Sequence, residues 1–293
     1  MSDIEQRPGE SGGGVVAPTP HKPYRELERS VELEHIEHPE SEELLTLNLG
    51  PHHPATHGVL RLLTTLEGEV VRDIKPIIGY VHTGIEKSCE DQQYWKVIPF
   101  VERMDYLSYY FNAMAFCMAV ERLLDVEVPE RAQYLRVIHM ELNRISSHLF
   151  WMATSILDFG AISFLWWGIR DREMTLDLFE MSSGQRMHPR YFQVGGVMED
   201  IPPGWVEKCR EFVERMPPRI EQYEAVLDKN EIFLHRTRNV GIVDTQRLLD
   251  LGVTGPLLRA SGHSWDLRKA APYSGYENFD GGAAVKYVLD PMG

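Results

Sequence analysis

The sequence PERAQYLRVIHMELNRISSHLFWMAT, residues 129–154, is the stretch that decides the fold class. Its apolar residues recur at steps of three and four, which places them along one side of an α-helix. They are Leu135, Ile138, Leu142, Ile145 and Leu149. Pro129 suits the first turn of a helix, where its missing amide hydrogen has no bond to make. The stretch therefore predicts a long helix with one face in a core.

Other segments of the chain share this helical pattern. We expect helices over 106–124, 162–183 and 205–227. The second should end near Gly184, and the dipeptide Pro217-Pro218 should break or kink the third, because proline removes a helical hydrogen bond. Asp244 is placed to cap a short helix that ends at Gly252.

A small sheet is predicted ahead of these helices. Leucine stands at every second position of residues 45–49, a period of two that is typical of a strand. Two further β-like runs, 59–66 and 69–77, meet at Glu67-Gly68 as in a hairpin. The expected fold class is α+β and mostly α-helical, a helical bundle with a small N-terminal antiparallel β-sheet.

Composition sets the domain organisation and excludes several classes of protein. Residues 1–43 are rich in glycine, proline and glutamate and cannot bury a core, so we expect a flexible tail followed by a single domain over 44–293. The 44 acidic residues exceed the 30 basic ones, giving a charge of −14, and such a chain is a poor partner for nucleic acid.

The cysteines and the apolar runs exclude two more classes. Cys89, Cys117 and Cys209 form no CxxC pair, so neither a zinc ribbon nor an iron–sulfur cluster of its own is supported, and no metal site is expected. The N-terminus lacks the features of a signal peptide. The longest apolar runs are far short of the roughly 20 residues of a spanning helix, so membrane contact should be peripheral.

Histidines are the first candidates for chemistry. Residues 50–58 read Gly-Pro-His-His-Pro-Ala-Thr-His-Gly, with His57 last of three histidines on a loop held by glycine and proline. Such a loop could relay protons or bind a metal, and it could equally be a surface turn. His82 and Glu86 would lie one turn apart if helical, where ordinary hydrogen bonding is commoner than metal binding.

Three further short motifs hold polar side chains that could carry chemistry. Arg103-Met-Asp-Tyr106 stands at the entry to a helix, where the tyrosine could donate a proton or simply pack in the core. Asp158 interrupts an apolar run, so it is either a buried carboxylate that needs a partner or a solvated helix-ending residue. His188 follows an arginine just after a helix.

Seven motifs in order resemble the D subunit of bacterial NADH:quinone oxidoreductase, the respiratory complex I component related to the large subunits of nickel–iron hydrogenases. The resemblance extends from about Leu45 to Tyr276. The motifs are Gly50–Gly58, His82–Lys87, Arg103–Tyr106, Leu157–Ala161, Gly184–His188, Gly195–Val197 and Tyr273–Tyr276.

The resemblance implies a quinone-site subunit. In the family, the positions of His57 and Tyr106 hold the quinone headgroup, and that of Asp158 pairs with the histidine. The positions of Arg103 and His188 lie near an iron–sulfur cluster that belongs to a neighbouring subunit. Quinone is then the substrate, and NAD is used only by the whole complex.

The resemblance also implies partners and a location. The expected partners are other components of complex I, especially its iron–sulfur B subunit, its C subunit and its membrane-embedded H subunit. The expected location is peripheral, on the cytoplasmic face of the bacterial cell membrane. The catalysed reaction would be reduction of quinone by NADH coupled to proton translocation, with the isolated chain inactive.

Two departures from the family limit the transfer of roles. The CxxC pairs that hold nickel in hydrogenases are absent, which opposes hydrogenase activity. The family continues beyond Tyr276, and residues 280–293 do not match it, so a C-terminal part is expected to be missing. A non-catalytic scaffold subunit that shapes the quinone cavity remains the alternative.

Overall fold

The computed structural model describes residues 44–52 and 58–278, and these divide between His82 and Thr83 into two compact units. The expected tail, residues 1–43, lies outside the described residues. The single domain expected over 44–293 stays a prediction.

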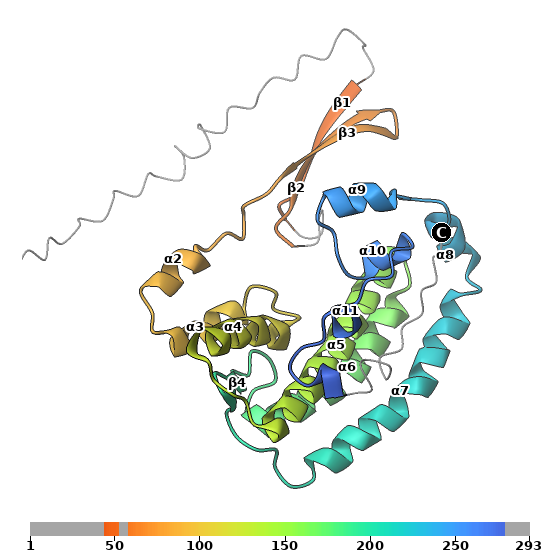
Figure 1. Cartoon of the computed structure of the whole chain (residues 1–293). Coiled ribbons are helices and arrows are strands. Elements are labelled where there is room, and N and C mark those ends of the chain that lie inside the picture. Colours follow the sequence, from red (N-terminus) through yellow and green to blue (C-terminus); the bar gives the residue numbers. More distant parts are fainter. Residues whose placement is uncertain (1–43, 53–57, 279–293) are drawn as a thin grey trace, which may run out of the picture. The chain divides into compact units, whose positions relative to one another are not determined.

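The first unit holds the small sheet that the sequence predicts. Its strands are β1 (Leu44–Leu49), β2 (Arg61–Glu67) and β3 (Val70–Ile77), paired antiparallel in the order β1-β2-β3 (Figure 1). Gly68 has a φ of +60° between β2 and β3, a conformation that glycine adopts without a steric penalty. The hairpin at Glu67-Gly68 is confirmed.

Helices make up most of the second unit (Figure 1). They are α2 (Ile85–Glu90), α3 (Tyr94–Val101), α4 (Tyr109–Leu124), α5 (Glu130–Asp158), α6 (Ile162–Ser183), α7 (Trp205–Leu227), α8 (Glu231–Thr237), α9 (Thr245–Asp250), α10 (Pro256–Ala260) and α11 (Leu267–Ala270), with the 3-10 helix η1 (Tyr276–Asn278) after them. A two-residue hairpin, β4 (Phe192–Gln193) and β5 (Gly196–Val197), follows α6. The α+β, mostly helical class is confirmed.

The helices α5 and α6 form the centre of the second unit. Gly168 of α6 allows them to approach closely, because a Cβ atom there would stand 2.7 Å from the Cβ of Ala153 and 2.8 Å from the carbonyl oxygen of Leu149. The end predicted for α6 is also observed, with Gly184 in the left-handed conformation as its C-cap.

The buried face of α5 is more polar than its leucine pattern predicts. Leu135, Leu142 and Leu149 are buried as expected, whereas Ile138 is exposed. Other buried positions on this helix are polar: Arg136, His139, Asn143 and Ser146. Each of the first three has hydrogen-bond partners on another element, which offsets the loss of hydration. The helix therefore faces the core with a hydrogen-bonding surface as well as an apolar one.

Of the break or kink predicted at Pro217-Pro218, the break does not occur, because α7 is one continuous helix from Trp205 to Leu227. Both prolines are exposed, so the carbonyl groups that they leave unbonded can be hydrated. The opposite face of α7 is anchored by four buried side chains, those of Trp205, Phe212, Met216 and Tyr223. Packing of this stripe compensates for the two missing hydrogen bonds.

Candidate functional site

The structure describes four of the five residues that the resemblance singles out. His57 lies outside the described residues, so its pairing with Asp158 stays a prediction. The other four, Tyr106, Asp158, Arg103 and His188, all belong to the second unit.

Tyr106 lies in the turn that connects α3 to α4, and its side chain is 60% exposed. The helix expected from residue 106 begins only at Tyr109. Hydrogen bonds hold the turn on both sides of Tyr106: Asn112 Nδ2 donates to the carbonyl of Asp105 at 3.0 Å, and Asn143 Nδ2 donates to the carbonyl of Leu107 at 3.0 Å. The phenol is therefore presented to the outside by a fixed backbone.

The anchor of this turn is Asn143, a buried residue of α5. Its Oδ1 also accepts from the amide of Tyr110 at 3.3 Å, so one side chain bonds both the turn and the first residues of α4. Because an unpaired amide in the core is costly, both bonds favour a single arrangement of the turn. The position of Tyr106 is therefore fixed by Asn143, a residue that lies in none of the seven motifs.

Asp158 is the last residue of α5, and it is exposed. The sequence allowed either a buried carboxylate or a solvated residue at a helix end, and the structure has the second. The apolar neighbours Ile156 and Phe159 instead line a small cavity of about 110 Å³ with residues of α7 and α8. The apolar run thus borders a cavity, while Asp158 itself stays at the surface.

Arg103 and His188 are brought together although they are 85 positions apart in sequence. Burial lowers the pKa of His188, and the positive charge of Arg103 lowers it further, while the main chain of Glu102 acts in the opposite direction. Arg103 is held at the end of α3 by a 2.6 Å hydrogen bond from its Nη1 to the carbonyl of Pro99. The net effect favours the neutral form of this imidazole.

Two more arginines, Arg172 and Arg190, lie next to the segment that carries this histidine. Arg172 of α6 is buried, and its Nη2 is 3.8 Å from the sulfur of Met187. The Nε atoms of Arg172 and Arg190 and the Nδ1 atom of His188 are buried, and none has a hydrogen-bond partner within the part of the chain that the structure describes. The two unsatisfied guanidinium donors favour a negatively charged or electron-rich group nearby.

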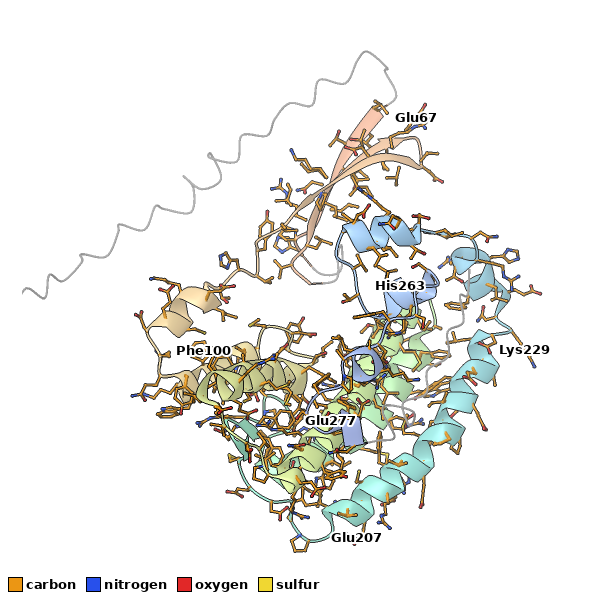
Figure 2. The ribbon with its side chains drawn as sticks, viewed as in Figure 1. Glu67, Phe100, Glu207, Lys229, His263 and Glu277 are labelled. Carbon is orange, nitrogen blue, oxygen red and sulfur yellow. The ribbon has the colours of Figure 1, made fainter. Side chains whose placement is uncertain are left out.

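Sequence reasoning missed Glu102, a completely buried carboxylate beside this group (Figure 2 labels Phe100, two residues before it, at the end of α3). Its two oxygens accept from the backbone amide of Arg190 at 2.9 and 3.1 Å. Burial raises the pKa of Glu102 to about 7, against the effects of that hydrogen bond and of Arg103. The sequence feature that could have indicated Glu102 is its position, because it is an acidic residue at the end of an apolar helix and directly precedes the Arg103–Tyr106 motif.

The other histidine motifs are less organised. The helix α2 begins at Ile85, so His82 precedes the helix that holds Glu86, and the helical spacing considered for these two residues is not present. Over residues 44–52 and 58–278, no group of three or more His, Cys, Asp and Glu side chains is arranged to hold a metal ion. Within the same ranges, no helix has the length and hydropathy required to cross a membrane.

Comparison with known proteins agrees with these motifs. The family model described as "Respiratory-chain NADH dehydrogenase, 49 Kd subunit" matches residues 158–290. The D subunit of NADH-quinone oxidoreductase from Acidothermus cellulolyticus is 51% identical over 238 residues, which are 80% of this chain and 54% of that protein. The D 2 subunit of the same enzyme from Chloroflexus aurantiacus is 50% identical over 237 residues, 81% of this chain and 58% of that protein.

A chloroplast relative has similar identity. The H subunit of the chloroplastic NAD(P)H-quinone oxidoreductase from Nephroselmis olivacea is 48% identical over 235 residues, 80% of this chain and 60% of that protein. The chain thus spans between 54% and 60% of the length of these three relatives. On these matches and on the motifs that it contains, the chain belongs to the family of NADH-quinone oxidoreductase D subunits.

Proposed function

We propose that this chain is the quinone-binding subunit of a respiratory NADH:quinone oxidoreductase. In that complex, electrons from the iron–sulfur cluster of a neighbouring subunit reduce quinone, and the reduction is coupled to proton translocation. The observation that carries the proposal is Tyr106, a phenol that is 60% exposed on a turn fixed by Asn112 and Asn143. A hydrogen-bond donor held in this way is suited to a carbonyl oxygen of a quinone.

Tyr106 and His57 would each hydrogen-bond one quinone carbonyl, and each is a candidate proton donor. Asp158 would orient His57 and stabilise its protonated form, which raises the pKa of the histidine. Asp158 itself lies at the exposed end of α5. Quinone needs two electrons and two protons, so two donors at opposite carbonyls match the reaction.

Arg103 and His188 would face the neighbouring subunit's iron–sulfur cluster. The supporting features are the buried, unbonded Nδ1 of His188 and the nearby guanidinium groups of Arg103 and Arg172. A cationic, partly desolvated surface stabilises an added electron on a cluster beside it. The cluster itself would be held by the neighbour, and this chain supplies the charges around it.

The assembly and its location belong to the same proposal. We expect contacts with the iron–sulfur B subunit, the C subunit and the membrane-embedded H subunit, and a peripheral position on the cytoplasmic face of the membrane. NAD would act only at the level of the complex. The relation to the large subunits of nickel–iron hydrogenases, with a shared helical bundle, is also part of the proposal.

A photoreactive quinone analogue tests the proposal in the assembled complex. We expect the label on this chain, competed by excess quinone, and strongly reduced in Tyr106→Phe. Tyr94→Phe is the matched control, because Tyr94 is also an exposed tyrosine, on α3. Labelling confined to other subunits would favour the alternative, a scaffold subunit that shapes the cavity without binding quinone.

A further inference from the structure

The turn that carries His188 has an unusual backbone. His188 has a φ of +54° and Arg190 a φ of +50°, and Pro189 stands between them. Left-handed φ values are unfavourable for residues with a side chain, so two of them in three residues persist only where surrounding contacts fix the turn. Those contacts therefore decide where the imidazole of His188 lies.

We propose that Glu102 is the positioning residue for His188, with its buried carboxylate clamping the turn through the amide of Arg190. The carboxylate oxygens lie 2.9 and 3.1 Å from that amide nitrogen, and Glu102 is 88 positions away in sequence. A hydrogen bond with the main chain of Glu102 also raises the pKa of the His188 ring, against the effect of burial. One residue at the end of α3 thus contacts the turn at two places.

Other contacts hold the turn without using the amide of Arg190. Gln193 Nε2 donates to the carbonyl of Arg190 at 2.8 Å. This bond does not compete with Glu102, which accepts from the amide of Arg190. The ring of Tyr109 packs edge-on against His188 with centroids 5.4 Å apart. The outer side of the segment is held by Arg186, whose side chain pairs with Glu173 at the surface. The bond to Glu102 is the charged one within the core.

The charge of Glu102 makes the clamp sensitive to pH. Arg190 and Arg103 face the carboxylate and favour its charged form, while burial favours the neutral form and places the pKa at about 7. From α4, Tyr109, Tyr110 and Cys117 face it as well, and all three are neutral near pH 7. A neutral carboxyl accepts the amide of Arg190 more weakly than a carboxylate does. The clamp is therefore strongest above pH 7.

Nuclear magnetic resonance of the full chain tests this clamp. In the wild type, the amide of Arg190 should be protected from exchange and its shift should titrate with a midpoint near the pKa of Glu102, about 7. Glu102→Ala should accelerate exchange of this amide about tenfold or more. It should also raise the pKa of His188 toward its ordinary value, because a released ring is hydrated. Glu102→Gln keeps an acceptor oxygen, so it should retain protection and lose the titration.

Glu173→Ala is the matched control, because it removes an acid that pairs with the same segment but bonds no backbone amide there. The clamp is refuted if Glu102→Ala leaves both Arg190 exchange and the His188 pKa unchanged, or if Glu173→Ala changes them equally. If Glu102→Ala does not fold, Glu102→Gln decides: an Arg190 amide that still titrates near 7 would refute the clamp. The role of His188 in the complex rests on the proposed function, but these measurements need no quinone and no partner, so either idea can fail alone.

Discussion

Glu121 of α4 and Arg136 of α5 form a buried ion pair, with Oε1 and Nη2 2.5 Å apart and side chains 8% and 1% exposed. The same Oε1 accepts from the amide of Gly195 at 2.8 Å, and Arg136 Nε donates to the carbonyl of Gly196 at 3.0 Å. The pair therefore fixes the β4–β5 hairpin against both helices. This hairpin follows directly after the turn that carries His188.

Arg136→Leu should lower the free energy of unfolding by about 3–5 kcal/mol, because it leaves the carboxylate of Glu121 buried without a positively charged partner. Arg131→Leu is the control. It removes an arginine of the same helix whose pair with Asp200 is exposed, and it should cost less than about 1 kcal/mol. Denaturant unfolding of both variants measures the difference. Equal losses of unfolding free energy would show that the buried ion pair stabilises the fold no more than the exposed one does.

His139 should make the protein sensitive to acid. Its ring is fully buried, Nδ1 donates to the carbonyl of Leu135 at 2.8 Å, and Nε2 then accepts from the hydroxyl of Ser182 at 3.0 Å. Burial lowers its pKa to about 4. Between pH 6.5 and 4 the unfolded chain takes up a proton at this site and the folded chain does not, so stability falls as pH falls through this window.

The variant His139→Gln should lose this part of the pH dependence, which amounts to about 3 kcal/mol at most. Its unfolding free energy at pH 7 should also be lower than that of the wild type, because the packing and the hydrogen bonds of the ring are altered. Unfolding by denaturant at pH 7 and pH 4.5 provides the comparison. If the unfolding free energies of the wild type and the variant decrease equally between the two pH values, His139 is not the source of the acid sensitivity.

Tyr106→Phe should reduce quinone turnover of the assembled complex by about tenfold or more, since one hydrogen bond to a carbonyl is lost. Because the side chain is exposed, the stability of the fold should change by less than about 0.5 kcal/mol. Electron transfer from NADH to an artificial acceptor upstream of the quinone should be retained. If both activities fall together, Tyr106 has a structural role only.

Asp158→Asn should slow quinone reduction without unfolding the protein. The carboxylate is exposed at the end of α5, so the expected change in stability is within about 0.5 kcal/mol. The buried Asp171 of α6 provides the contrast, because it accepts hydrogen bonds from Tyr223 and Arg170. Asp171→Asn should cost about 1–3 kcal/mol. A large loss of stability in Asp158→Asn would instead indicate that this carboxylate is part of the fold.

The sequence by itself determined the elements whose signals are local. Alternating leucines marked β1, Glu67-Gly68 marked the hairpin, and the end of α6 at Gly184 was correctly predicted. These signals lie within a few neighbouring residues, where side-chain period and glycine conformation decide the outcome. The motifs that identified the family are likewise short and contiguous.

Only the tertiary structure decided which distant residues meet. Pro217 and Pro218 remain within one helix because packing on the other face of α7 outweighs their local preference. The exposure of Asp158 depends on which side of the apolar run faces the neighbouring helices. Glu102 reaches Arg190 across 88 positions, and no local pattern encodes such a pairing, because it arises when α3 and the turn after α6 are brought together by the core.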